Sequence, residues 1–191
     1  MEILYTDKDI IVCVKPVGPD SEHDVPAQLG KAVYAVHRLD KNVGGVMVYA
    51  QTKEAAAALS RAIQDGSMVK EYVAMVHGTP PENGDWEDWL FKDSSKNKVF
   101  VVKKERKGVK KARLEFQRLS AGEKSLVRIR LHTGRSHQIR VQFSSRGYPL
   151  LGDHKYGARD EYAAPMLYSC RLTFPHHGKT VSFDSLPDWA K

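Results

Sequence analysis

The chain has only two cysteines and no long apolar run among its 191 residues. Cys13 and Cys170 each lie in a strand-like apolar stretch, as the reduced, buried thiols of cytoplasmic proteins commonly do. The longest apolar runs, such as residues 10–14 and 46–50, have the length of a strand and are too short to cross a membrane. The first residues carry acids and no apolar signal segment. We therefore expect a cytoplasmic protein that does not enter a membrane.

The usual metal-binding patterns are also missing, since neither Cys-x-x-Cys nor His-Glu-x-x-His occurs. His37, His132, His137 and His154 are the candidate ligands. His132 and His137 do not have the spacing of a helical pair, and no cysteine or acid completes a set. Ser136 beside His137 has neither the Gly-x-Ser-x-Gly frame nor the orienting acid that histidine-assisted hydrolysis requires. We expect no metal site.

Hydrophobic residues make up 41% of the chain and charged residues 28%, which is ordinary for a soluble globular protein and excludes a disordered one. A chain of 191 residues can bury a real core within one domain. Internal repeats and low-complexity tracts are absent. We expect a single domain over residues 1–191 that acts as a monomer.

The positive charge is concentrated in one segment. Residues 92–118 contain eleven lysines and arginines against three acids, a net charge of +8, whereas the whole chain carries +7. Such a stretch attracts phosphates whatever their sequence, although it would equally suit a solvated, lysine-rich hairpin. Phe100, Phe116 and alternating valines favour a structured hairpin with a basic face. We therefore expect contacts with a polyanion such as RNA, made by side chains that include Lys103, Lys104, Lys110 and Lys111.

Strand-like stretches alternate with turn residues over most of the chain. We predict strands at residues 9–14, 45–50, 70–76, 99–104, 112–119 and 125–131, and a final hairpin at 168–174 and 180–183. Residues 17–31 have few apolar anchors and are expected to form a loop, and the Pro- and Gly-rich stretch 78–84 a break.

Two helices are predicted. The first covers residues 53–64, with Thr52 as its cap and Gly66 at its end; its buried face would be Ala55, Ala58, Leu59, Ala62 and Ile63. The second runs from residue 135 or 136 to 146 and ends at Gly147. Few helices and clustered strands predict an α+β fold on a mixed, mostly antiparallel sheet.

Asp40 is the candidate catalytic acid. It closes the sequence His37-Arg38-Leu39-Asp40 and lies in a short loop, between the apolar stretch 32–36 and a Gly-Gly pair. Such a position fixes a carboxylate and leaves access for a large substrate. An aspartate in a loop is, however, most often a turn residue.

Arg140 and Tyr72 are the candidate partners of this acid. Arg140 follows Gly134-Arg135-Ser136-His137-Gln138-Ile139 and is expected at the edge of a buried face, where a guanidinium needs a carboxylate. Pairing with Asp40 would keep the acid ionised by lowering its pKa, and a structural salt bridge to another acid is equally compatible. Tyr72 closes Lys70-Glu71-Tyr72 on a predicted buried strand, where a tyrosine is usually part of the core.

These three motifs, the opening block 9–16 and the block 147–157 occur in the order found in the RluA-type pseudouridine synthases, which the chain closely resembles. The resemblance implies the pseudouridine synthase fold and an enzyme that isomerises chosen uridines in rRNA or tRNA. The bond between uracil N1 and the ribose is broken, and the base is rejoined through C5 without a cofactor or a metal. Asp40 would be the essential acid, as nucleophile or as base, with Arg140 as its partner.

The resemblance also implies RNA contacts. Tyr72 would stack on the target base, and Arg38 would fill the place of the extruded uridine. We further expect contacts from His37, Arg135 and His137. Many members carry Thr-Ser-Gly where this chain has residues 43–45, Val-Gly-Gly, so hydroxyls that bond the loop are missing here. We expect a short form without the accessory S4 domain, acting on a compact rRNA or tRNA stem-loop.

Two other classes of function are compatible with parts of this sequence. A catalytically idle RNA-binding or RNA-folding protein could use the same fold, but it would have no need to keep Asp40 together with its arginine and tyrosine. A glycosidase would need two carboxylates that flank one bond. Only one acid is carried by a motif, and Asp153 is better interpreted as a turn residue. An RNA pseudouridine synthase is the stronger prediction.

Overall fold

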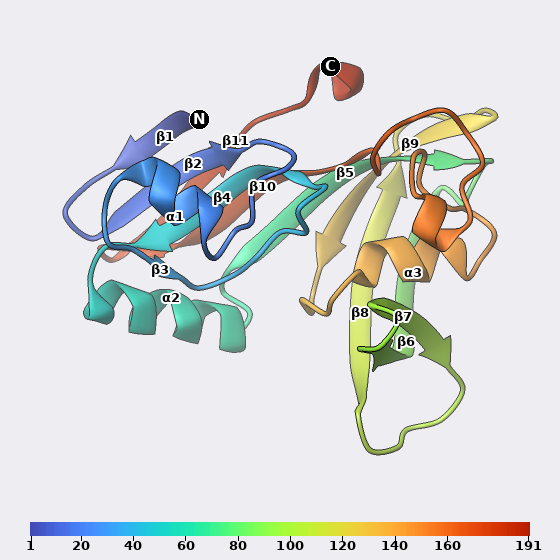
Figure 1. Cartoon of the computed structure of the whole chain (residues 1–191), viewed down its shortest axis with the longest axis horizontal. Helices are drawn as coiled ribbons and strands as arrows, with labels where there is room; N and C mark the ends of the chain where they lie inside the picture. The colour runs from blue at the N-terminus through green and yellow to red at the C-terminus, as the bar shows by residue number, and fades with distance from the viewer. The chain divides into compact units, whose positions relative to one another are not determined.

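The computed structural model describes all residues from 1 to 191 and contains eleven strands and three α-helices (Figure 1). The predicted α+β class with a mixed, mostly antiparallel arrangement is confirmed. The chain divides into two compact units, one made of residues 1–71 and 168–191 and the other of residues 72–167. A single catalytic domain over the whole chain stays a prediction. None of the helices is long and apolar enough to span a membrane.

The first unit is a sheet with one main helix. Its elements are β1 (Glu2–Thr6), β2 (Ile10–Lys15), α1 (Asp24–Leu29), β3 (Tyr34–Ala35), β4 (Gly44–Ala50), α2 (Lys53–Gln64), β10 (Leu167–His176), β11 (Lys179–Asp184) and a 3-10 turn at Asp188–Ala190. The strand order is β1-β2-β4-β10-β11, with β3 paired to β4. All these pairs are antiparallel except β4 with β10.

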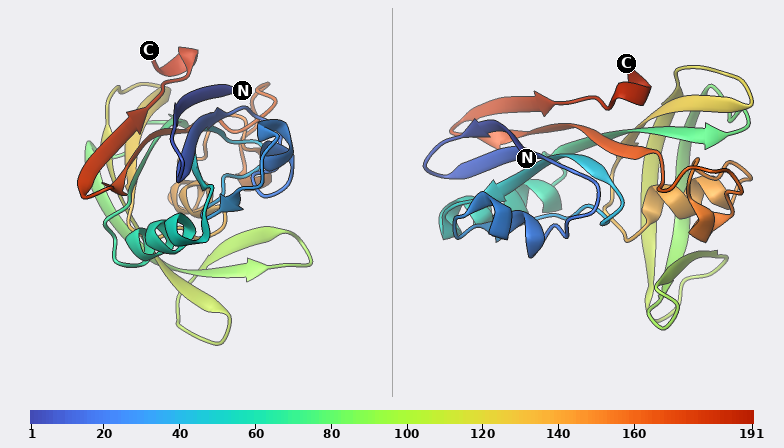
Figure 2. Two further views of the ribbon diagram at one scale, coloured as in Figure 1. Left: turned by 90° about the vertical axis from the view of Figure 1, so that its left-hand side faces the viewer. Right: turned by 45° about the horizontal axis from the view of Figure 1, so that its top comes forward.

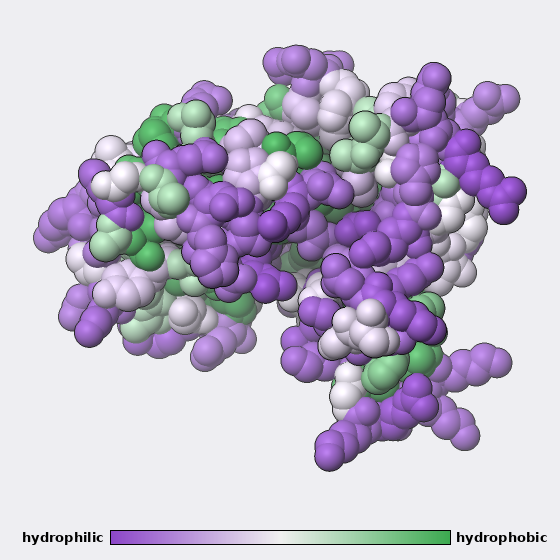
Figure 3. All heavy atoms as spheres, in the orientation of Figure 1, coloured by the Kyte–Doolittle hydropathy of each residue, from purple (hydrophilic) through white to green (hydrophobic).

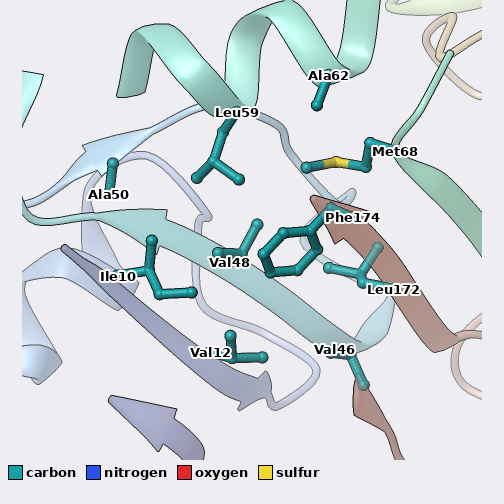
Figure 4. Packing of buried hydrophobic residues seen from close by; sticks show 10 residues of the cluster. All are labelled: Ile10, Val12, Val46, Val48, Ala50, Leu59, Ala62, Met68, Leu172 and Phe174. Carbon is teal, nitrogen blue, oxygen red and sulfur yellow. The ribbon is translucent and has the colours of Figure 1, made fainter. Parts of the chain in front are cut away.

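The core of this unit lies between α2 and the sheet (Figure 4). Leu59 and Ala62 of α2 are buried in one cluster with residues of β2, β4 and β10. Thr52 caps the helix as predicted, because its side chain accepts a hydrogen bond from the amide of Ala55 at 3.1 Å. The predicted buried face needs one correction. Ala58 is exposed, and Ala56 packs against the core in its place.

Gly45 determines how closely β4 and β10 approach. It has a φ of +125°, and a Cβ atom at this position would lie 2.3 Å from the carbonyl oxygen of Ser169. Ser169 pairs with Gly45 in the parallel ladder. Only glycine fits here, because any side chain would push the two strands apart.

Two predictions for the first unit were incomplete. The predicted loop 17–31 contains the short helix α1, with Val25 as its buried residue. The chain also starts with a strand, β1, which pairs with β2 and was not predicted. Both elements are short and mostly exposed, so neither leaves a clear apolar period in the sequence.

The second unit is built on antiparallel strands. The chain enters it along β5 (Val69–His77), followed by β6 (Asn83–Asp93), β7 (Lys98–Val102), β8 (Val109–Arg118), β9 (Lys124–Leu131), α3 (Gln138–Ser144) and a 3-10 turn at His154–Tyr156. The order of the last four strands is β9-β8-β6-β7. The rings of Trp86, Phe116 and Phe143 pack together with centroids 4.4–5.1 Å apart.

The predicted hairpin between residues 99–104 and 112–119 is wrong. The strand β6 lies between them and pairs with β8 on one side and β7 on the other. This strand was missed because its first half, Asn83–Asp88, is mostly polar and the whole strand has no β-branched residue.

The second predicted helix is shorter than expected at both ends. It covers Gln138–Ser144, and His137 before it has a left-handed φ of +49°. The side chain of Gln138 explains the late start, because its oxygen accepts bonds from the Thr133 hydroxyl at 2.8 Å and the Arg135 amide at 3.0 Å. These bonds hold residues 133–137 as a loop. Gly147 turns the chain away after the helix with a φ of +85°.

Candidate active site

Lys15 holds the loop that carries Asp40. The side chain is fully buried at the end of β2, and its Nζ faces four carbonyl oxygens. Those of Asp40, Lys41 and Val43 lie at 3.4, 3.2 and 2.8 Å, and that of Pro16 at 3.0 Å. Burial lowers the pKa of Lys15 to about 8, against the opposing effect of Asp20 and Asp40. The ammonium thus holds the backbone of this loop through its carbonyl groups.

Leu39 is fixed from the other side by Ser21. The Ser21 hydroxyl donates to the Leu39 carbonyl at 2.9 Å and accepts from the Leu39 amide at 3.1 Å. Tyr49 of β4 donates its hydroxyl to the Ser21 carbonyl at 2.7 Å. All three residues are buried. The backbone next to Asp40 is therefore tied to the sheet through two side chains, which orients the carboxylate before any substrate binds.

His37 has a structural contact within the first unit. Its Nε2 accepts a hydrogen bond from the Val48 amide at 3.1 Å. Burial, with a smaller effect from the charge of Lys70, lowers the pKa of His37 to about 3. The imidazole is therefore neutral near pH 7 and does not offer a positive charge to a phosphate. Its predicted role in binding RNA stays a prediction that the geometry does not favour.

Arg38 and Asp40 differ in exposure. Arg38 is exposed, and its guanidinium lies 3.0 Å from the carboxylate of Glu22. Asp40 is partly buried, and its carbonyl closes a turn by accepting the Val43 amide at 2.9 Å. An exposed arginine held by one surface acid is available to a polyanion, because such pairs contribute little.

In the second unit Arg140 has a buried acid as its partner. Its Nε lies 2.7 Å from Oδ2 of Asp153, and Nη2 donates to Oδ1 at 2.8 Å, so the pair is bidentate. Both side chains are buried. Asp153 does end a turn, since its amide bonds to the Leu150 carbonyl at 3.1 Å, and it also forms with Arg140 the salt bridge to an acid other than Asp40 that the sequence left open. Pairing of Arg140 with Asp40 stays a prediction, because the two residues belong to different units.

The aromatic ring of Tyr156 lies against the same arginine, and its hydroxyl is held by two other residues. The guanidinium of Arg140 lies 5.1 Å from the ring centroid. The Tyr156 hydroxyl accepts the Val99 amide at 2.9 Å and bonds to Nδ1 of His137 at 2.8 Å. His137 is thus part of the support of Arg140, which its predicted role in RNA binding did not include. A carboxylate and an aromatic face together fix the direction of a planar guanidinium.

Tyr72 and Arg135 were also predicted to belong to the site. Tyr72 lies buried on β5, as the prediction of a buried strand required. Arg135 is exposed, and its Nε donates to the carbonyl of Lys111 at 2.9 Å. The stacking of Tyr72 on a base and the contact of Arg135 with RNA stay predictions.

The basic segment combines exposed lysines with lysines engaged in contacts. Lys111 lies 2.8 Å from Glu87 and above the ring of Trp89. Lys103, Lys104 and Lys110 are exposed and have no ion pair. The connection between β7 and β8 projects from the second unit, and hydrophilic side chains cover its end (Figures 1 and 3). A cavity of about 180 Å³ beside it is lined by Lys92, Lys110 and Arg135, together with Leu90, Val99, Gly108, Gly134 and Ser136.

Sequence reasoning missed four supporting residues: Lys15, Ser21, Asp153 and Tyr156. Lys15 offered a signal, since a lysine inside an apolar strand is unusual unless its charge is satisfied. Asp153 and Tyr156 lie in the block 147–157, but nothing in their spacing indicates contact with a helix residue. Ser21 offered no signal.

Comparison with known proteins identifies the family. The family model described as RNA pseudouridylate synthase matches residues 9–145. The chain belongs to this family. The resemblance inferred from the motifs is thereby confirmed. An uncharacterized RNA pseudouridine synthase of Aquifex aeolicus is 31% identical over 93% of this chain and 64% of its own length. The ribosomal large subunit pseudouridine synthase D of Vibrio parahaemolyticus is 35% identical over 83% of this chain and 53% of its own length.

Solved structures show the same fold. Human RNA pseudouridylate synthase domain containing 1 superposes with a TM-score of 0.84 at 22% identity, over 97% of this chain and 83% of that chain. Human RNA pseudouridylate synthase domain containing 4 gives 0.81 at 24% identity, over 98% and 89%. The chain spans 53% and 64% of the length of the two curated relatives described above. The pseudouridine synthase fold is therefore established for this chain.

Proposed function

We propose that this chain is an active RNA pseudouridine synthase in which Asp40 is the essential acid. The construction of the Asp40 loop carries this proposal. Lys15 and Ser21 fix the backbone on both sides of the acid, while Asp40 itself is only partly buried. A folding protein without catalysis would have no need to fix one carboxylate in this way. Family membership and the order of the motifs support the same conclusion.

The chemistry assigned to the site needs an ionised carboxylate. Asp40 either adds to C1′ of the ribose or removes a proton from the sugar, and the bond between C1′ and N1 of uracil breaks. The free base rotates and C5 bonds to C1′, as Asp40 leaves C1′ or returns the proton to the sugar. The C5 proton is lost to water, and N1 takes up a proton from water. Arg140 would keep Asp40 ionised with the part of its guanidinium that Asp153 does not engage. Tyr72 would stack on the base, and Arg38 would fill the vacated place in the RNA. No step requires a metal or a cofactor.

Ribosomal RNA is the proposed substrate class. Several curated relatives carry the name ribosomal large subunit pseudouridine synthase D. The exposed lysines of the β7–β8 connection would supply affinity for phosphates that does not depend on sequence. A tRNA arm is the other compact target that the same surface would suit. We propose that the protein works as a cytoplasmic monomer.

The proposal is tested by release of tritium from C5-labelled uridine. Ribosomal RNA and tRNA are offered separately to the wild type, to Asp40→Asn and to Asp188→Asn, an exposed aspartate with no place in the site. We expect release from ribosomal RNA by the wild type and by Asp188→Asn. In Asp40→Asn the rate should fall by about a thousandfold or more. Undiminished binding of RNA with no release by any variant would instead indicate an idle RNA-binding protein.

A further inference from the structure

Two turns meet at one end of the first unit, the β1–β2 turn with Asp7 and Asp9 and the β10–β11 turn with His176 and His177 (Figure 2). Nε2 of His176 lies 2.7 Å from Oδ2 of Asp7. Nε2 of His177 lies 3.5 Å from the same oxygen and 3.1 Å from Oδ2 of Asp9. The donor atoms of Asp7, His176 and His177 thus lie within 4.8 Å of one another, and Asp9 contacts His177 beside them.

Hydrogen bonds from two backbone amides determine which oxygen of Asp7 faces the histidines. Oδ1 accepts the amides of Asp9 and Ile10, both at 2.8 Å, so it closes the turn. Oδ2 remains on the other side, where the hydroxyl of Tyr5 donates to it at 3.1 Å. These bonds fix the orientation of the carboxylate, as the outer-sphere support of a metal ligand does.

The hairpin turn brings the second histidine back to the same place. His176 pairs with Lys179, and His177 and Gly178 between them have φ values of +48° and +73°. This is the two-residue turn with left-handed φ at both positions that suits a twisted hairpin. Asparagine, aspartate and glycine are the residues preferred there, and histidine is unusual. The two imidazole rings lie with centroids 4.0 Å apart.

The spacing of these atoms fits tetrahedral coordination. Zinc bonds of about 2.0–2.2 Å place neighbouring ligand atoms roughly 3.3 Å from one another. The observed separations of 2.7 and 3.5 Å lie on both sides of this value. The donor atoms of Asp7, His176 and His177 are all within 4.8 Å of one another. One carboxylate and two neutral imidazoles supply three ligands to a divalent ion, and solvent would supply the fourth.

We propose that Asp7, His176 and His177 form a binding site for a divalent transition metal, with Zn²⁺ as the ion that fits best. Two nitrogen ligands and one oxygen ligand suit Zn²⁺ and exclude Mg²⁺ and Ca²⁺, which prefer oxygen alone. The ion clips the β1–β2 turn to the β10–β11 turn. This departs from the expectation of no metal site, which considered other histidines. Sequence spacing does not indicate this set, because 169 residues separate Asp7 from His176.

The site has no part in the proposed isomerisation. It lies at the Ile10 end of β2, whereas Lys15, which holds the Asp40 loop, lies at the other end. Five residue steps along a strand are about 17 Å. The ion would stabilise the first unit without contact with the catalytic loop. Binding of metal and release of tritium therefore test two separate proposals.

The test is titration of the full chain with Co²⁺, whose tetrahedral complexes absorb visible light, followed by displacement with Zn²⁺. The variant is His177→Asn, because asparagine keeps the left-handed turn and removes the imidazole. The control is His23→Asn, since His23 also contacts one aspartate, Asp20, at 3.0 Å but has no second histidine.

We expect one Co²⁺ per chain with tetrahedral absorption in the wild type and in His23→Asn, and no absorption with Mg²⁺. His177→Asn should weaken binding at least about tenfold, the cost that even a lost outer-sphere partner of a metal ligand reaches. Saturating Zn²⁺ should raise Tm by a few °C in the wild type and in His23→Asn but not in His177→Asn, since a ligand of the folded state stabilises it. Absence of saturable Co²⁺ binding, or equal affinity in His177→Asn, would overturn the proposal and leave a His176–Asp7 ion pair between the turns.

Discussion

The ammonium of Lys15 lies 2.8 Å from the carbonyl oxygen of Val43 and 3.4 Å from that of Asp40, so one buried cation spans the loop that carries the proposed catalytic acid. A buried ammonium without acceptors would cost several kcal/mol, and here four carbonyls surround it. The loop and the lysine therefore depend on each other. The ammonium can stay charged while buried because the carbonyls accept its hydrogen bonds. The carbonyls can point inward because the ammonium is their donor.

Replacing Lys15 with methionine should separate folding from catalysis. Methionine fills the volume but removes the donor that the carbonyls of Asp40, Lys41 and Val43 share; those of Asp40 and Lys41 keep one bond each, to the amides of Val43 and Gly18. The loss costs about 1–3 kcal/mol of unfolding free energy for each group that stays buried without a donor. We expect a decrease of tritium release by about a hundredfold or more, with nearly unchanged RNA affinity. Urea unfolding and the release assay measure the two effects.

Lys41→Met is the matched control for this prediction, because Lys41 is exposed on the same loop. It should leave both stability and the rate of release within a factor of about two. Equal losses in the two variants would show that the loop responds to any change of charge and not to the buried ammonium.

The pair of Arg140 and Asp153 predicts a large loss of stability. Asp153→Asn leaves a buried guanidinium with a neutral partner, and removal of one member of such a pair costs roughly 3–5 kcal/mol. The released arginine would also lose its direction, so tritium release should decrease as well. Urea unfolding of Asp153→Asn, Arg140→Met and the double variant gives the coupling energy. Additive losses would mean that the two side chains do not act as a pair.

His37 predicts a pH dependence in mild acid. Burial lowers its folded pKa to about 3, while an unfolded histidine titrates near pH 6.5. Between these values the unfolded chain binds a proton that the folded chain does not. Stability should therefore fall as the pH decreases from about 6.5, with a slope of at most about 1.4 kcal/mol per pH unit. Most carboxylates titrate below this range, and a variant without His37 separates its effect from that of the other histidines in urea unfolding between roughly pH 6.5 and 4.5.

His37→Gln removes the titrating group, and the oxygen of glutamine takes the place of Nε2 as acceptor for the Val48 amide. This variant should show a flatter acid slope than the wild type. His23→Gln, at an exposed position, should follow the wild type. A slope in His37→Gln equal to that of the wild type would mean that His37 is protonated in the folded state.

The motifs predicted the candidate residues of the site, and the periodicity predicted much of the fold. Neither predicted the side chains that hold the candidate residues in place. The helix 53–64, its Thr52 cap and most strands could be read from apolar spacing and turn residues, because these are local properties. The strand β6 and the start of α3 could not. The first is polar on one side, and the second depends on a bond from Gln138 to Thr133. Lys15, Ser21 and Asp153 act across long sequence separations, which no local pattern encodes.

The basic segment predicts unequal contributions from neighbouring lysines. Lys103 and Lys104 are exposed and without an acid, whereas Glu87 lies 2.8 Å from Lys111 and already balances part of its charge. Each lysine that neutralises one phosphate should contribute about 0.7–0.9 to the slope of log affinity against log salt. The double variant Lys103→Gln/Lys104→Gln should lower this slope by roughly 1.4–1.8, and Lys111→Gln should lower it by clearly less than one such contribution. Filter binding of ribosomal RNA at several salt concentrations measures these slopes. Lys53→Gln on α2 is the control for Lys111→Gln, because each variant removes one positive charge. Equal slopes in the wild type and the double variant would place the RNA contact outside the β7–β8 connection.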